Sequence, residues 1–167
     1  MEKFIIDAGP FIHLSQIGEI TLLEKFPSLY TPDSVISEIN LGEEVPIQKI
    51  HRWKNLKILR VREKTIPEID VAIKDFGLHA AEREAIYLAH QLKPCIVLTD
   101  DLNARRACEN LLIEVHGTVG IIAYAFHNKW LSFKRARQSL LFLYRKSSLF
   151  VTSAIIERAI EELRRSV

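Results

Sequence analysis

The chain has 167 residues, 48% of them hydrophobic and 26% charged, a balance that excludes an intrinsically disordered protein. Its formal net charge of +2 excludes the strong overall positive field of a highly basic nucleic-acid-binding protein. Two cysteines exclude a disulfide framework, and no apolar stretch is long enough to span a membrane. Because the first predicted strand begins at residue 4, we expect no signal peptide. We therefore expect one domain over residues 1–167, located in the cytoplasm.

Short apolar runs alternate with longer segments that carry apolar residues at helical spacing. In chain order, the predicted elements are a strand at 4–6, a helix at 10–26, a strand at 29–30, helices at 32–40 and 47–54, a strand at 56–61, helices at 66–76 and 80–92, a strand at 96–98, a helix at 102–110, a strand at 113–115, and helices at 119–129, 133–146 and 152–165. Strands that alternate with helices pair in parallel through right-handed crossovers. We therefore predict an α/β fold, a three-layer α/β/α sandwich with a central parallel sheet. The C-terminal helices, at about 133–165, are expected to pack on the core.

The last third of the chain is locally basic. Its basic residues are Lys129, Lys134, Arg135, Arg137, Arg145, Lys146, Arg158, Arg164 and Arg165, and its acids from residue 152 onward are Glu157, Glu161 and Glu162. A surface that contacts a phosphate backbone and a solvated helix face both explain this excess.

Five acidic residues from distant segments stand where such a fold can gather them: Asp7, Glu38, Glu82, Asp100 and Asp101. Three of them directly follow apolar strands, at the edge where open α/β sheets place their binding sites. Each acid alone has a structural explanation as a helix cap, a partner of a helix dipole or a solvated side chain. Together they favour Mg²⁺ or Mn²⁺, which take oxygen ligands and suit phosphodiester hydrolysis. The six histidines form no ligand pair, and we assign none of them a catalytic role.

The segments that carry these acids resemble the four motifs of the PIN-domain family, in the family's order. They are residues 5–12, 31–38, 78–86 and 98–106, and the run 117–121 resembles a structural turn of the same family. The resemblance spans nearly the whole chain. It is closest to the stand-alone prokaryotic subgroup related to the VapC-type toxins of type II toxin–antitoxin pairs.

This resemblance implies a metal-dependent endoribonuclease in which Asp7, Glu38, Glu82 and Asp101 hold one or two Mg²⁺ or Mn²⁺ ions. Asp100 is then an outer catalytic helper or a helix cap. The implied partners are an RNA substrate, a small cognate antitoxin protein and a second copy of the chain in a homodimer.

Several alternatives stay open at this point. Ala81 stands where the subgroup often has Gly, and Glu84 competes with Glu82 as the ligand although it points to a different helix face. Arg105 and Arg106 are candidates for contacts with RNA phosphates, whereas an ion pair within the helix would explain Arg105 equally well. A PIN-like module that binds RNA or protein without cleaving it is the main alternative function, and an acid-rich phosphatase or phosphoacceptor is a weaker one.

Overall fold

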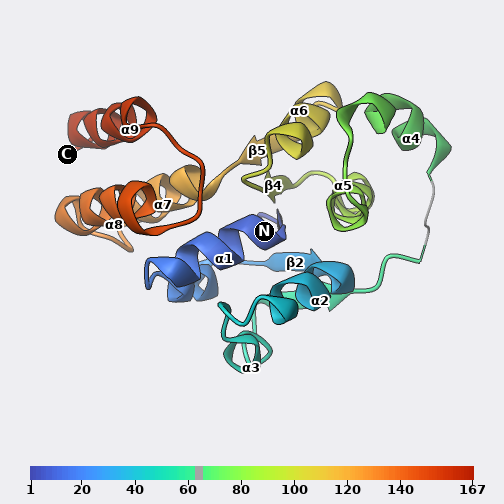
Figure 1. Cartoon of the computed structure of the whole chain (residues 1–167), viewed down its shortest axis with the longest axis horizontal. Coiled ribbons are helices and arrows are strands. Elements are labelled where there is room, and N and C mark those ends of the chain that lie inside the picture. Colours follow the sequence, from blue (N-terminus) through green and yellow to red (C-terminus); the bar gives the residue numbers. More distant parts are fainter. Residues whose placement is uncertain (63–65) are drawn as a thin grey trace.

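The computed structural model of the chain describes residues 1–62 and 66–167 (Figure 1). The described strands are β1 (Phe4–Ile6), β2 (Leu29–Pro32), β3 (Leu56–Leu59), β4 (Ile96–Leu98) and β5 (Glu114–His116). The described α-helices are α1 (Ala8–Gln16), α2 (Asp33–Leu41), α3 (Ile47–Ile50), α4 (Pro67–Ile73), α5 (Ala80–Leu92), α6 (Leu102–Asn110), α7 (Thr118–His127), α8 (Phe133–Lys146) and α9 (Ser153–Arg165). Two 3₁₀ segments, η1 (Ile20–Lys25) and η2 (Lys74–Phe76), follow α1 and α4.

The five strands form one sheet in the order β3-β2-β1-β4-β5, and each pair of neighbours is parallel. The chain builds outward from β1 through β2 to β3, and then returns to place β4 on the other side of β1. This reversal lies between β1 and β4, where an open parallel sheet opens a crevice at the carboxyl ends of its strands. The residues that follow Ile6 and Leu98, which are paired in register, therefore lie side by side at this edge.

The alternation of side chains along the strands divides the core into two clusters, one on each face of the sheet. Phe4 and Ile6 point into one cluster, and Ile5 between them points into the other. Buried residues of α1, α2, α3, α7, α8 and α9 join the first cluster together with Ala81 of α5. The other buried hydrophobic residues of α5 and those of α4 belong to the second, as do Ala107 and Cys108 of α6. Helices on both faces of a parallel sheet make the predicted three-layer α/β/α sandwich, and that prediction is confirmed.

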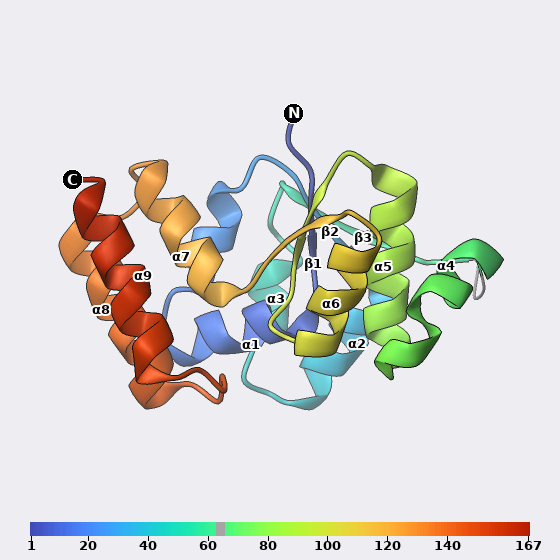
Figure 2. The same cartoon turned by 90° about the horizontal axis from the view of Figure 1, so that it is seen from above.

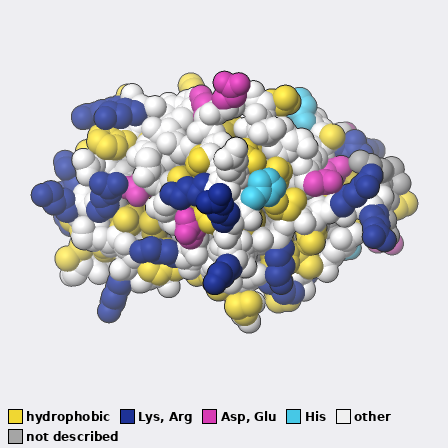
Figure 3. Space-filling view, turned by 90° about the horizontal axis from the view of Figure 1, so that it is seen from below, with side chains coloured by type: hydrophobic (Ala, Val, Ile, Leu, Met, Phe, Trp, Pro, Cys, Tyr) yellow, Lys and Arg dark blue, Asp and Glu magenta, His cyan; other side chains and the backbone are white. Residues whose placement is uncertain are grey.

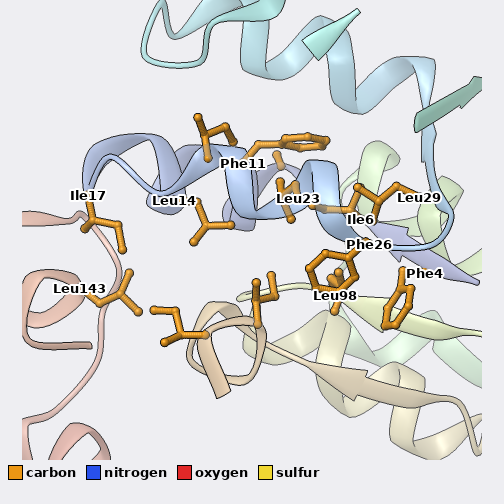
Figure 4. Close-up of a cluster of buried hydrophobic side chains, with 14 of the residues drawn as sticks. Phe4, Ile6, Phe11, Leu14, Ile17, Leu23, Phe26, Leu29, Leu98 and Leu143 are labelled. Atoms are coloured by element: carbon orange, nitrogen blue, oxygen red, sulfur yellow. The ribbon is translucent and has the colours of Figure 1, made fainter. Parts of the chain in front are cut away.

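The last two helices pack against the buried cluster that α1 and α7 share. Figures 1 and 2 show α8 and α9 beyond α7 at one end of the molecule, and α4 at the other end. Leu143 of α8 belongs to the same buried cluster as Phe11 and Leu14 of α1 (Figure 4). Ile17, which directly follows α1, is part of this cluster too. In the described part of the chain, no helix is both long and apolar enough to cross a membrane.

One predicted helix is wrong, because the segment 10–26 does not form a single helix. Helix α1 ends at Gln16, and Gly18 then adopts a φ of +74°, a backbone conformation that favours glycine. The chain turns there so that the buried Glu19 carboxylate accepts hydrogen bonds from the Arg135 Nε–H at 2.6 Å and the Ser139 hydroxyl at 2.8 Å. This contact with α8 fixes the turn. The residues around Gly18 do not predict it, because the partners of Glu19 lie 116 and 120 positions away in the sequence.

Two further predicted elements are longer than the observed ones. The predicted helix 47–54 stops at Ile50 in α3, and the predicted strand 56–61 stops at Leu59 in β3. In the first case the chain turns so that Trp53 is buried against the core. In the second, the register of β3 with β2 ends at the pair Pro32–Leu59, because β2 gives way to α2.

Candidate active site

A pocket of about 780 Å³ opens at the carboxyl ends of the parallel strands. The five acids predicted from the sequence all line it, together with Arg105. They reach the pocket from the starts of α1, α5 and α6 and from the middle of α2. The fold thus brings together side chains from four segments that are far apart in the sequence.

Asp7 lies deepest in the pocket and is only 5% exposed. It directly follows β1, and its Oδ2 accepts a hydrogen bond of 2.9 Å from the hydroxyl of Thr99. Burial raises the pKa of Asp7 to about 6, although the Ala8 N–H and the Thr99 hydroxyl oppose this rise. The negative charges of Glu82 and Glu38 raise this pKa further. Burial and two neighbouring acids therefore disfavour the ionised form of Asp7.

Asp101 caps the helix that follows β4. Its Oδ1 accepts a hydrogen bond from the Ala104 N–H at 2.7 Å, as expected for an N-cap residue of α6. Its own N–H donates to the Thr99 hydroxyl oxygen at 3.2 Å, so that Thr99 contacts both Asp7 and Asp101. One buried hydroxyl therefore connects the two carboxylate positions that follow β1 and β4.

Glu82 and Glu38 complete the acidic side of the pocket. Glu82 lies in the first turn of α5, where its Oε2 accepts the backbone N–H of His79 at 2.8 Å. Burial raises the pKa of Glu82, the His79 contacts oppose this, and the charges of Asp101 and Glu38 raise it again. Glu38 is an exposed residue of α2. The shared electrostatic effects show that these four carboxylates act on one another.

Glu84 is placed differently from Glu82. It is 7% exposed, lies on another face of α5 and accepts a hydrogen bond from the Ser34 hydroxyl of α2. It is not among the residues that line the pocket in the described structure. Of the two alternatives left open by the sequence, Glu82 is thus the one at the pocket, and its role as a ligand stays a prediction.

Asp100 holds elements together at the pocket wall. Its Oδ2 lies 2.7 Å from His13 Nδ1 and accepts the Thr118 hydroxyl at 2.5 Å, while its Oδ1 accepts the Thr118 N–H at 2.7 Å. These bonds connect the end of β4 to α1 and to the start of α7. A Cβ added at Gly117 would lie 2.7 Å from Asp100 Oδ1, so this close approach requires glycine. The helix cap of α6 is Asp101, and the role of Asp100 as an outer catalytic helper stays a prediction.

Among the two arginines of α6, Arg105 lines the pocket and Arg106 is an exposed residue outside it. For the described residues, no ion pair is recorded between Asp101 and Arg105, so the intrahelical pair considered above is absent there.

The pocket also contains residues that the sequence did not single out. His13 and His116 line it, as does the segment Ser148, Leu149, Phe150 and Val151 between α8 and α9. No local pattern marks these positions, since their approach depends on the packing of α1 and the last helices.

The donor chemistry of the pocket fits a hard divalent cation, because it consists of carboxylate oxygens with a buried acid among them. Within residues 1–62 and 66–167, no three His, Cys, Asp or Glu side chains are grouped closely enough to hold a metal ion. Two of the acids instead face backbone N–H groups, Asp101 toward Ala104 and Glu82 toward His79. Each of these bonds uses one carboxylate oxygen, and the second oxygen of each group is the one suited to a cation.

Comparison with known proteins identifies the family to which this arrangement belongs. No curated protein matches the chain at a significant level. A family model described as a PIN domain matches residues 3–165. Because this match covers nearly the whole chain, the protein belongs to the PIN-domain family, whose fold is that of nucleases.

Proposed function

We propose that this protein is a metal-dependent endoribonuclease that hydrolyses RNA phosphodiester bonds. The observation that carries the proposal is the pocket itself, in which Asp7, Glu38, Glu82 and Asp101 interact electrostatically at the carboxyl edge of the sheet. A folded protein gains nothing in stability from a buried acid with a raised pKa beside two other acids. Such an arrangement is typical of a functional site, and a cation would relieve it.

These four carboxylates would hold Mg²⁺ or Mn²⁺, directly or through waters. When bound, the metal supplies a water of lowered pKa as nucleophile and neutralises charge on the phosphate. The chain's own contribution is positional. Thr99 fixes the Asp7 carboxylate, the Ala104 N–H fixes that of Asp101, and Asp100 fixes the wall formed by α1 and α7. Because these hydrogen bonds already hold the carboxylates in place, no binding energy of the substrate is needed to order them.

Basic side chains near the pocket support a nucleic-acid substrate. Arg105 lies in the pocket wall, where it could meet a phosphate that flanks the scissile bond. Lys and Arg side chains are also spread over the face of the molecule on the α3 side, where several acidic side chains lie among them (Figure 3). An arginine in the wall of a small acidic pocket suits a substrate that carries phosphate groups better than a small neutral substrate.

The finer assignment follows from the resemblance of the motifs. We propose that the protein is the toxin of a type II toxin–antitoxin pair, that a small antitoxin protein restrains it, and that it forms a homodimer. In this role the antitoxin would place a basic side chain among the four carboxylates, where a positive charge is favoured for the same reason as a cation.

The deciding experiment is cleavage of a labelled pool of single-stranded RNA by the purified protein. It is run with Mn²⁺ or Mg²⁺, with EDTA, and with the variants Asp7→Asn and Asp101→Asn. We expect cleavage that requires the metal and falls at least 100-fold in both variants, as for the loss of a group that acts in the transition state. Intact RNA with a folded wild-type protein across several RNAs would contradict the nuclease and favour the binding module.

The pair of glutamates in α5 provides a matched control. Glu82→Gln and Glu84→Gln each remove one negative charge from the same helix. We expect Glu82→Gln to abolish cleavage with little change in thermal stability, because Glu82 lines the pocket. Glu84→Gln should leave cleavage measurable and lower the stability instead, because Glu84 is buried and bonded to Ser34. The reverse result would make Glu84 the functional residue.

A further inference from the structure

One wall of the pocket is apolar and exposed, in contrast to its acidic side. Phe150 is 96% exposed, Ile155 is 50% exposed and Leu102 is 62% exposed, and all three line the pocket that contains the carboxylates. Large exposed apolar side chains scattered singly over a surface need no explanation. Three that gather at the mouth of one polar pocket indicate a binding surface.

Phe150 is held in this position by the segment around it. This segment connects α8 to α9, and its neighbours on either side, Leu149 and Val151, pack against the buried core. The Ser148 N–H donates to Gln16 Oε1 at 2.8 Å, which attaches the segment to the end of α1. The alternation of inward and outward side chains therefore forces Phe150 outward on a short, anchored stretch of chain. Its aromatic face is presented without the entropy cost of ordering a free loop.

We propose that Phe150 is the stacking platform for an unpaired nucleobase of the RNA whose phosphate group reaches the carboxylates. This inference rests on the proposed function for the nature of the polymer, and it adds the requirement that the RNA be single-stranded at this point. Stacking needs only the flat face of a base, so it binds many sequences and selects against bases that are stacked inside a duplex.

The size and charge of the surroundings favour a nucleotide over an apolar protein segment as the occupant. A volume of about 780 Å³ is within the range of pockets that take small molecules, and it combines an apolar wall, an acidic side and Arg105. Arg145 and Lys146, both exposed, end α8 just before the segment that carries Phe150. Lys146 lies over the ring of Phe142, 4.0 Å from its centroid, so the cation that shares the pocket with Phe150 is Arg105. A strand that stacks on Phe150 with a phosphate group at the carboxylates therefore passes Arg105.

The test measures binding separately from cleavage. A short single-stranded RNA with one 2-aminopurine is titrated with the full-length protein in EDTA, which keeps the RNA intact, and stacking is read as quenching of 2-aminopurine fluorescence. The variants are Phe150→Ala, Phe150→Leu and Phe150→Trp. Tyr144→Ala is the control, because Tyr144 is another exposed aromatic residue, 48% exposed, that is not among the described pocket residues.

We expect quenching by the wild type and by Phe150→Trp, and an affinity about tenfold lower for Phe150→Ala, in the range that one lost base–aromatic stack produces. Phe150→Leu, which keeps apolar area without a π-face, should resemble Phe150→Ala. The control should bind like the wild type, and the affinity for a duplex RNA should be the same in all variants.

Four results would overturn this inference. The first is wild-type affinity in Phe150→Leu, and the second is an equal loss of duplex binding in Phe150→Ala. The third is a change of oligomeric state in the Phe150 variants by light scattering, which would make the surface a protein contact. An unaltered cleavage rate on single-stranded RNA in Phe150→Ala, without any loss of affinity, would reject the platform and leave the nuclease standing. Quenching that depends on Phe150 in a protein that cleaves nothing would reject the nuclease and leave the platform standing.

Discussion

The Thr99 hydroxyl lies 2.9 Å from Asp7 Oδ2 and donates a hydrogen bond to it, across the boundary between β4 and β1. Thr99 is only 1% exposed, so water does not replace this bond if it is lost. A buried carboxylate with a raised pKa therefore depends on one hydroxyl for part of its stabilisation. This contact makes Thr99 the residue through which the ionisation of Asp7 can be altered without changing Asp7 itself.

Replacing Thr99 with valine removes this donor and keeps the side-chain shape. We expect Thr99→Val to lower the free energy of unfolding at neutral pH by about 1–3 kcal/mol, the cost of leaving a buried polar group without its partner. Urea unfolding measures the change. Thr99→Ser keeps the hydroxyl and is the matched control. Equal stability of the valine and serine variants would show that the hydrogen bond does not contribute to the free energy of unfolding.

The raised pKa of Asp7 predicts a stability that falls as the pH rises. Below 3.8, the ordinary value, the carboxyl is protonated in both folded and unfolded chains and has no effect. Between 3.8 and about 6 the unfolded chain loses the proton first, and the folded state is disfavoured increasingly. Above about 6 the full cost is present, at most roughly 3 kcal/mol for this difference in pKa.

Asp7→Asn should therefore be more stable than the wild type at pH 7.5 in EDTA, and equally stable at pH 3.5. Urea unfolding of both proteins across this range checks the prediction. Asn keeps an oxygen that can accept from Thr99, so the comparison isolates the charge. A constant difference between the two proteins at every pH would contradict the assigned pKa.

Divalent metal should stabilise the folded protein, because it binds the assembled carboxylates and not the unfolded chain. The gain in unfolding free energy is about 2.7 kcal/mol when the metal is present at about 100 times its Kd. We expect millimolar Mn²⁺ to raise the Tm of the wild type in a thermal melt. Asp7→Asn should respond less, and identical responses of the two proteins would argue against a metal site at these residues.

Gly117 should tolerate no side chain, because the space beside it is occupied by Asp100. An added Cβ would lie 2.7 Å from Asp100 Oδ1 and 3.3 Å from Arg105 Nη1. We expect Gly117→Ala to cost about 1–3 kcal/mol of stability, as overpacking does, and to reduce cleavage by displacing the pocket wall. Gly42→Ala is the control, since its nearest recorded neighbour is the Ile39 carbonyl oxygen at 3.9 Å. Equal thermal melts for the two variants would contradict this account.

The sequence predicted the alternation of elements and the acids at the sheet edge because both are local properties. Helices α5, α6 and α8 and strand β4 have the predicted bounds, since apolar periodicity and the flanking Pro94 mark them within a few residues. The placement of Asp7 and Asp101 also followed from their position directly after apolar strands. Parallel strands present their carboxyl ends at one edge, whatever the details of packing.

The division of roles between neighbouring acids could not be predicted, because it depends on distant partners. Asp100 and Asp101 are adjacent in the sequence, but their hydrogen-bond partners differ. Asp100 contacts His13 and Thr118, whereas Asp101 accepts from the N–H of Ala104. Similarly, nothing near Phe150 in the sequence indicates that the end of α1 anchors its segment to the pocket. The break after Gln16 was missed for the same reason, since the partner of Glu19 lies in α8.

The contact between Thr99 and Asp7 joins residues 92 positions apart, and the one between Ser148 and Gln16 joins residues 132 positions apart. Contacts of such long range form late in folding, because the chain between them must first be ordered. During synthesis, the N-terminal half therefore emerges with Asp7, Glu38 and Glu82 but without the strand that brings Asp101 beside them. The catalytic centre we propose is complete only when β4 inserts next to β1, so a chain made as far as α5 carries three of the four carboxylates without the pocket that gathers them.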